Sequence, residues 1–110
     1  MQFRLKIARS SCMATLIKTN DINDRQKRAI LVVGGVSERE EVLKSCELID
    51  LDTHQVYSFG QANFAVFSGS LVVFNNSTIL RLGGLSKNKR DYSVVEVVEK
   101  LDFQDAYLQF

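Results

Sequence analysis

The sequence lacks several residue types that mark common protein architectures. Its 110 residues include no proline, no tryptophan and only one histidine. The absence of proline argues against a proline-rich linker and against an obvious internal boundary. We therefore expect residues 1–110 to form one region, the size of a single small domain.

Cysteine is also scarce. Cys12 and Cys46 are too few for a disulfide framework, and neither has the close Cys or His neighbours of a zinc site. We expect both to be reduced thiols, and we expect the chain to bind no metal or other cofactor.

Long apolar runs and an excess of one charge are missing as well. No run approaches the roughly 18–20 apolar residues of a transmembrane helix, and residues 1–9 alternate charged and apolar side chains where a signal peptide is continuously apolar. Fourteen basic and 13 acidic residues give a formal charge of +1. Composition thus indicates neither a membrane nor a nucleic-acid partner, and a cytoplasmic location is expected.

Catalytic constellations are equally sparse. His54 lies in a predicted turn, and neither cysteine is near it in the sequence. Glu38, Glu40 and Glu41 belong to a charged run that is typical of a solvated loop. The glycine pairs lack the lysine and helix of a phosphate-binding loop. We expect the protein not to be an enzyme.

What the sequence does contain is a repeat. The segment 30–37, Ile-Leu-Val-Val-Gly-Gly-Val-Ser, returns at 79–86 as Ile-Leu-Arg-Leu-Gly-Gly-Leu-Ser, and Gly34 and Gly83 are 49 residues apart. Glu47 and Glu96 follow the two glycine pairs at the same distance. Recurrence at this spacing is typical of stacked supersecondary units that cannot bury their apolar faces alone.

Each repeat reads as four short strands, ordered strand, hairpin, strand, Gly-Gly, loop, strand, turn, strand. The segment 37–44 is predicted to be a loop with at most one turn of helix, because two turns are too few for a stable isolated helix. The predicted strands are 13–18, 29–33, 46–51 and 56–59 in the first repeat and 71–74, 78–82, 92–98 and about 106–108 in the second.

This pattern resembles the kelch repeat, whose copies form the blades of a β-propeller. The matching residues are Gly34, Gly35, Glu47 and Tyr57 in the first repeat and Gly83, Gly84, Glu96 and Tyr107 in the second. The resemblance implies an all-β fold with two four-stranded antiparallel blades, residues 12–60 and 61–110. The chain departs from the family in carrying tyrosine where tryptophan is usual, and Tyr107 needs a one-residue insertion. A small β-sandwich, with two sheets face to face, is the alternative fold.

By analogy with the family, the chain is expected to be a non-catalytic protein-interaction module, part of a scaffold or a substrate-recruiting adaptor, whose partner is another protein. The alternatives are a fragment of a kelch-like propeller enzyme and a purely structural piece that completes a larger ring. The resemblance places the candidate binding loops on one face: Ser37, Arg39, Glu40, Gln61, Asn63, Ser86, Lys87, Lys89 and Arg90.

Two blades leave open ends, because kelch propellers close with more blades than two. Apolar side chains such as Val72 and Val97 are then expected to meet water, and large exposed apolar patches are unusual in monomers. The chain is therefore expected to self-associate, three copies making one ring, or to be a segment of a longer propeller.

Overall fold

The computed structural model describes the chain except for residues 1, 21–22, 24, 76–77, 89–90 and 103–110. The described residues form strands and turns without a helix, and every strand pairing is antiparallel, which confirms the all-β class. The segment 37–44 contains no turn of helix; it closes a small hairpin in which Val36 pairs with Val42.

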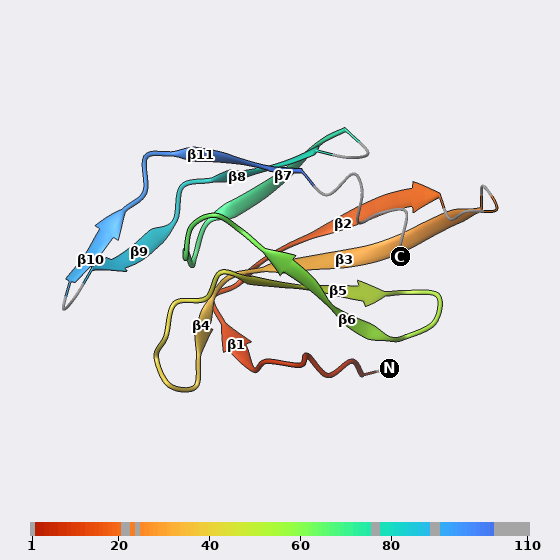
Figure 1. The fold of residues 1–110 in the computed structure, drawn as a ribbon, viewed down its shortest axis with the longest axis horizontal. Coiled ribbons are helices and arrows are strands. Elements are labelled where there is room, and N and C mark those ends of the chain that lie inside the picture. Colours follow the sequence, from red (N-terminus) through yellow and green to blue (C-terminus); the bar gives the residue numbers. More distant parts are fainter. Residues whose placement is uncertain (1, 21–22, 24, 76–77, 89–90, 103–110) are drawn as a thin grey trace.

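The first sheet has the four strands that the sequence predicts. They are β2 (Met13–Asn20), β3 (Gln26–Val33), β5 (Ser45–Asp50) and β6 (Val56–Gln61), ordered β2-β3-β5-β6. Consecutive strands are neighbours, so the sheet is a simple meander (Figure 1).

The second sheet has three described strands, β7 (Ser70–Asn75), β8 (Thr78–Leu82) and β11 (Val98–Asp102), ordered β11-β8-β7. The predicted strand at 106–108 lies outside the described residues. The predicted strand 92–98 is interrupted, because β9 (Leu85–Asn88) and β10 (Asp91–Val94) form a separate hairpin and residues 95–97 lead from it into β11. The valine-rich composition of residues 92–98 did not reveal the break.

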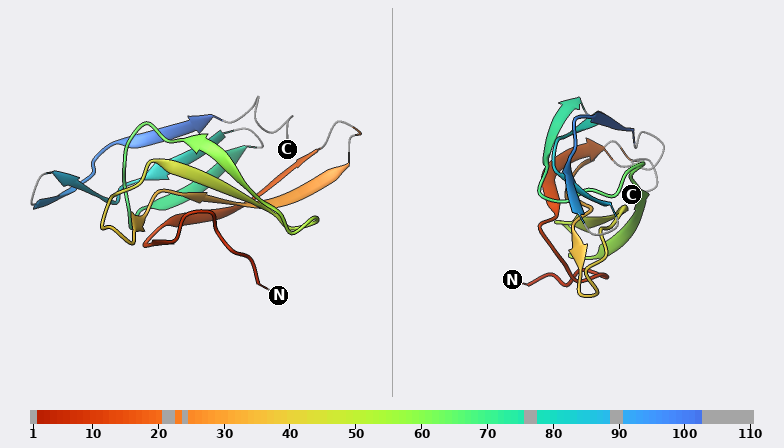
Figure 2. Two further views of the ribbon diagram at one scale, coloured as in Figure 1. Left: turned by 60° about the horizontal axis from the view of Figure 1, so that its bottom comes forward. Right: turned by 90° about the vertical axis from the view of Figure 1, so that its left-hand side faces the viewer.

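One hydrophobic core joins the two sheets. The first sheet contributes one face, which we call the inner face, with Met13, Ile17, Leu31, Val33 and Leu48 among its buried side chains. The second sheet contributes the face that carries Ile79 and Leu101, which we call the covered face. Figure 2 shows the two sheets as separate layers.

The N-terminal segment covers part of the other side of the first sheet, which we call the N-terminal face. There, β1 (Arg9–Ser10) pairs with β4 (Val36–Ser37), and residues 2–8 run along the side that faces away from the second sheet (Figures 1 and 2). Val32, Glu47 and Ile49 are buried on this face. The inner face of the first sheet and part of its N-terminal face are thus removed from water.

The two glycine pairs have nearly the same backbone geometry. Gly34 and Gly83 have φ values of +66° and +63°, and Gly35 and Gly84 both have +99°. Backbone at these angles is open to glycine and strained for residues with a Cβ. The repeat seen in the sequence is therefore also a repeat of local conformation.

The second glycine pair supplies a matched stability test. At Gly84 a Cβ atom would lie 2.5 Å from Cγ1 of Val66 and 2.8 Å from the carbonyl oxygen of Phe67, whereas at Gly83 a Cβ would meet nothing within 4 Å. We predict that Gly84→Ala lowers the free energy of unfolding by about 2–5 kcal/mol, and Gly83→Ala by about 1–2 kcal/mol, in urea denaturation. Equal losses for the two variants would contradict this packing of the glycine pair.

Candidate functional site

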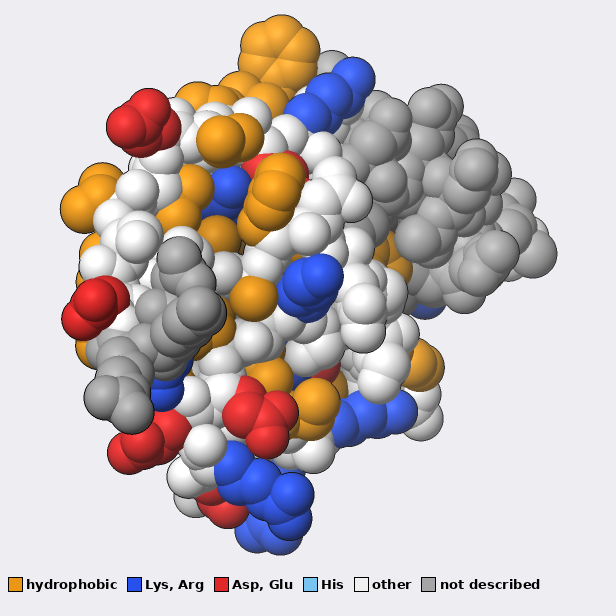
Figure 3. Space-filling view, turned by 60° about the vertical axis from the view of Figure 1, so that its left-hand side comes forward, with side chains coloured by type: hydrophobic (Ala, Val, Ile, Leu, Met, Phe, Trp, Pro, Cys, Tyr) orange, Lys and Arg blue, Asp and Glu red, His pale blue; other side chains and the backbone are white. Residues whose placement is uncertain are grey.

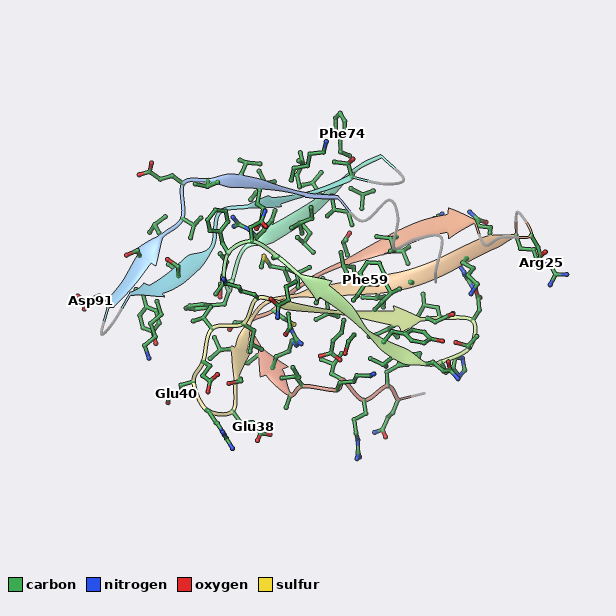
Figure 4. The ribbon with its side chains drawn as sticks, in the orientation of Figure 1. Arg25, Glu38, Glu40, Phe59, Phe74 and Asp91 are labelled. Atoms are coloured by element: carbon green, nitrogen blue, oxygen red, sulfur yellow. The ribbon has the colours of Figure 1, made fainter. Side chains whose placement is uncertain are left out.

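The structure brings the loops that the sequence singled out to one end of the molecule, which we call the loop end. The β4 hairpin, the β9–β10 hairpin and the connection between the sheets, residues 62–69, all lie at this end (Figure 1). Glu38, Glu40 and Asp91 mark its two tips, while Arg25 marks the opposite end of the molecule (Figure 4).

In the first loop, Ser37 has a structural role. Its hydroxyl oxygen accepts hydrogen bonds from the backbone N–H groups of Arg39 and Glu41, both at 3.3 Å. A serine that caps a tight turn in this way fixes the loop without needing a helix. Arg39 and Glu40 stay exposed at the tip, and Glu40 has a left-handed backbone with φ of +62°.

The remaining loop residues differ in their surroundings. Gln61 ends β6 and is exposed, and Ser86 and Lys87 belong to β9 rather than to a loop. The backbone N–H of Asn63 donates to Oε2 of Glu99 at 2.6 Å, so this residue also anchors the connection between the sheets. Lys89 and Arg90, the centre of the expected basic tip, lie outside the described residues.

The loop end also contains an apolar groove that the sequence did not indicate. We call it the loop-end groove; its volume is about 360 Å³, and its lining residues are Phe64, Val66, Ser86, Val94, Val95, Glu96 and Val97. The exposed fractions of Phe64, Val94 and Val97 are 50%, 79% and 51%. Figure 3 brings this end forward, with hydrophobic side chains gathered over its upper part and charged side chains over its lower part.

A buried ion pair anchors the N-terminal segment to the first sheet. Nη2 of Arg9 lies 2.6 Å from Oε2 of Glu47, and the two side chains are 0% and 2% exposed. The carboxylate also accepts the backbone N–H groups of Lys6 and Ile7. The guanidinium donates further to the carbonyl oxygens of Gly34 and Ser45. Every charge in this pair is matched within the protein, as burial of an ion pair requires.

The second sheet repeats this pair with an arginine from a different place. Nε of Arg81 lies 2.9 Å from Oε1 of Glu99, with side chains 0% and 2% exposed. Nη1 of Arg81 donates to the carbonyl oxygen of Gly83, as Arg9 does to that of Gly34, 49 residues earlier. Each glutamate thus pairs with a buried arginine and accepts a backbone N–H group, although the arginines reach them from β1 and from β8.

The structure corrects the expectation that Glu96 is the counterpart of Glu47 in the second repeat. Glu96, which follows the second glycine pair at the predicted distance, is exposed in the segment between β10 and β11. The glutamate that occupies the position of Glu47 is Glu99, three residues later, because the β9–β10 hairpin lengthens the second repeat. Arg81 pairs with Glu99 across the strands where Val32 pairs with Glu47.

His54 and Tyr57 make contacts within the protein. His54 lies in the β5–β6 turn and makes an edge-to-face contact with Phe3, with 5.5 Å between the ring centroids. Tyr57 lies on β6, is 38% exposed and donates its hydroxyl hydrogen to Gln55. Tyr107 lies outside the described residues.

A second cleft, of about 300 Å³, lies beside the Arg9–Glu47 pair. The charged groups of Arg9 and Glu47 in this cleft already bond to one another and to the backbone. Among the described residues, no group of three His, Cys, Asp or Glu side chains is arranged to hold a metal ion. In the same part of the chain, no helix has the length and apolarity that a membrane crossing requires.

Sequence reasoning missed two parts of the site, and one of them left a signal. Arg81 interrupts an otherwise apolar strand between Leu80 and Leu82, and a charge within a buried strand indicates a buried partner. The loop-end groove left none, because Phe64 and Val94 are 30 residues apart and meet only through the fold.

Comparison of the sequence with protein-family models and with curated proteins finds no match. The class of the protein therefore follows from its fold alone: it is an all-β protein of stacked antiparallel sheets.

The Arg81–Glu99 pair makes the first prediction for this site. Replacement of Arg81 by Met leaves Glu99 buried without its counter-charge, and we predict a loss of about 3–5 kcal/mol in the free energy of unfolding. Arg28 and Asp52 form a matched exposed pair at 3.6 Å, with side chains 57% and 44% exposed. Arg28→Met is expected to cost less than about 1 kcal/mol. Similar losses in urea denaturation would show that Arg81 is not buried as described.

The cysteines make the second prediction. Both are free; Cys46 is buried and Cys12 is half-buried. Burial raises the pKa of the Cys46 thiol to about 11, so it stays protonated at pH 8 and out of reach of a thiol reagent. We predict that Cys12→Ser shows no reactive thiol in a colorimetric thiol assay until it is unfolded. Prompt reaction of the native variant would contradict the burial of Cys46.

Proposed function

We propose that the chain is a non-catalytic protein-interaction module, built from two consecutive kelch-type propeller blades, that binds another protein through its loop end. The observation that carries the binding role is the exposed apolar groove at the end where the loops gather. The architecture rests on separate observations, which concern how the two sheets correspond.

The correspondence between the sheets supports two copies of one unit. Besides the glycine pairs, Ser11 and Ser68 have φ values of +52° and +58° and each lies two residues before the first strand of its sheet. The pairing of Ser10 with Val36 in the first unit has its counterpart in the bridge between Phe67 and Leu85 in the second. These features extend the similarity to segments whose sequences differ.

The manner in which the sheets stack favours blades over a sandwich. Glu47 and Glu99 are equivalent, yet Glu47 lies on the N-terminal face of the first sheet and Glu99 on the covered face of the second. The two sheets therefore pack through different faces, head to tail, as repeated blades do. In a two-sheet sandwich related by a two-fold axis, equivalent faces would meet.

The loop-end groove has the chemistry of a protein contact. Phe64, Val94 and Val97 expose apolar surface beside charged loops, and interfaces commonly combine an apolar centre with a polar rim. A partner that inserts an aromatic or aliphatic side chain between these residues would bury them, and such anchors carry much of the affinity of an interface. Ser37, Arg39, Glu40, Gln61 and Lys87 lie in elements at the same end and are proposed as the surrounding polar contacts.

The binding role is tested by quantitative affinity capture with the intact chain as bait. Val94→Lys places a charge in the groove and is expected to lower the recovery of specifically captured proteins at least about tenfold, the effect of removing a hot-spot contact. The control, Gln26→Lys, adds the same charge at an exposed position of β3 next to Arg25, at the opposite end of the molecule (Figure 4).

The control should capture as wild type does. Capture that is unaffected by Val94→Lys, or equally weakened by Gln26→Lys, would contradict a role for the groove. A purified chain that turns over a substrate would contradict the non-catalytic assignment.

A further inference from the structure

The second sheet has an apolar face that the described residues leave uncovered, which we call the outer face. It carries Val72, Phe74, Leu80, Leu82 and Val98. The exposed fractions of Val72, Phe74 and Val98 are 45%, 70% and 54%, and Phe74 points away from the first sheet (Figure 4). Apolar side chains gathered on one face of a sheet in this way mark a binding surface.

The correspondence between the units identifies this face as a counterpart of the core. Because Leu31 and Val33 lie 49 residues before Leu80 and Leu82, the outer face of the second sheet is equivalent to the inner face of the first. On the inner face, Ile17 and Cys46 are only 2% and 1% exposed. The same kind of face is thus buried once and, within the described part of the chain, left uncovered once.

The first sheet offers the complementary surface. Its N-terminal face is equivalent to the covered face of the second sheet, because Ile30 and Ile79 correspond, as do Glu47 and Glu99. The N-terminal segment covers the half near Glu47, as the connection between the sheets covers the half near Glu99. The other half of the N-terminal face is uncovered by the described residues and includes Leu16, which is 48% exposed. Leu16 corresponds to Val73 of β7, the strand of the second sheet that lies beside β2.

We infer that the outer face of the second sheet docks on the N-terminal face of the first sheet of a second copy of this chain. This contact would repeat between two copies the interface that each copy already buries between its own sheets. The inference rests on the proposed two-blade architecture and deepens it by naming the occupant of the open face. Two polar residues depart from the apolar pattern of the outer face: Lys100 lies where Leu48 does on the inner face, and Ser70 lies where Met13 does.

Such a contact joins two different surfaces, so a dimer still has one free surface of each kind and can bind further copies. Repeated head-to-tail contacts close into a ring when the rotation between copies permits and otherwise extend into a filament. Closure into a ring is expected, because consecutive blades of a propeller turn about a common axis.

The test is the mass of the intact chain in solution, measured by light scattering after size exclusion across a range of concentrations. We expect a closed species whose mass is a whole multiple, greater than one, of the 12.4 kDa chain. Val72→Lys should weaken the self-association at least tenfold and yield the 12.4 kDa monomer, while Ser93→Lys, with the same added charge on β10, should keep the wild-type mass. A folded wild-type monomer at every concentration would overturn the inference and point to a sheet of another protein as the occupant.

Cysteine cross-linking tests which faces meet. In a Cys12→Ser background, Val72→Cys and Leu16→Cys are made as separate chains and mixed under mild oxidation. We expect the disulfide to join one chain of each kind, because Val72 lies on the outer face and Leu16 on the N-terminal face. A disulfide between two Val72→Cys chains, in place of the mixed one, would show a symmetric contact and overturn the head-to-tail arrangement.

The two proposals fail independently. If Val72→Lys leaves the mass of the wild type unchanged while Val94→Lys still abolishes capture, the docking is wrong and the binding role stands. If Val72→Lys releases a monomer while Val94→Lys leaves capture unchanged, the docking stands and the role of the loop-end groove is wrong.

Discussion

The structure depends on one constraint: both faces of each sheet carry apolar side chains, so each sheet needs a cover on both sides. The first sheet meets this requirement with the second sheet on its inner face and the N-terminal segment on part of the other. In the second sheet, the described residues cover only the covered face, which packs against the core. Burial of apolar surface is the main favourable term in both folding and association. The requirement that builds the core therefore also favours a partner that covers the outer face of the second sheet.

The buried arginine–glutamate pairs show how the fold accommodates charge within this constraint. A buried ion pair seldom adds stability relative to apolar packing, but the loss of one partner is costly, so a pair favours one geometry over its alternatives. Here each arginine joins two parts of its sheet. It pairs with a glutamate, on β5 or on β11, and it donates a hydrogen bond to the carbonyl oxygen of Gly34 or of Gly83. The arginine comes from β1 in one unit and from β8 in the other. The fold therefore requires a guanidinium group at this place in space, and not an arginine at one place in the sequence.

The sequence predicted the first sheet well and the second only in part. The first sheet combines short runs of strand-forming residues with turn residues and a glycine stop, and those local signals suffice for β2, β3, β5 and β6. The second failed between Tyr92 and Val98, where a run rich in valine is equally compatible with one strand or with two separated by a bend. The shift from Glu96 to Glu99 has the same origin, because an insertion in a loop changes the spacing without changing the pattern. The groove at Phe64 depends on long-range packing, which no local signal reports.

We propose that two copies of one β-unit stack head to tail, and methyl NOEs in solution test this arrangement. Contacts are expected from methyl groups of the inner face, such as those of Ile17 and Leu31, to those of Ile79 and Leu101 on the covered face. Contacts from the inner face to Leu80, Leu82 or Val98 instead would mean that equivalent faces meet, and would contradict it.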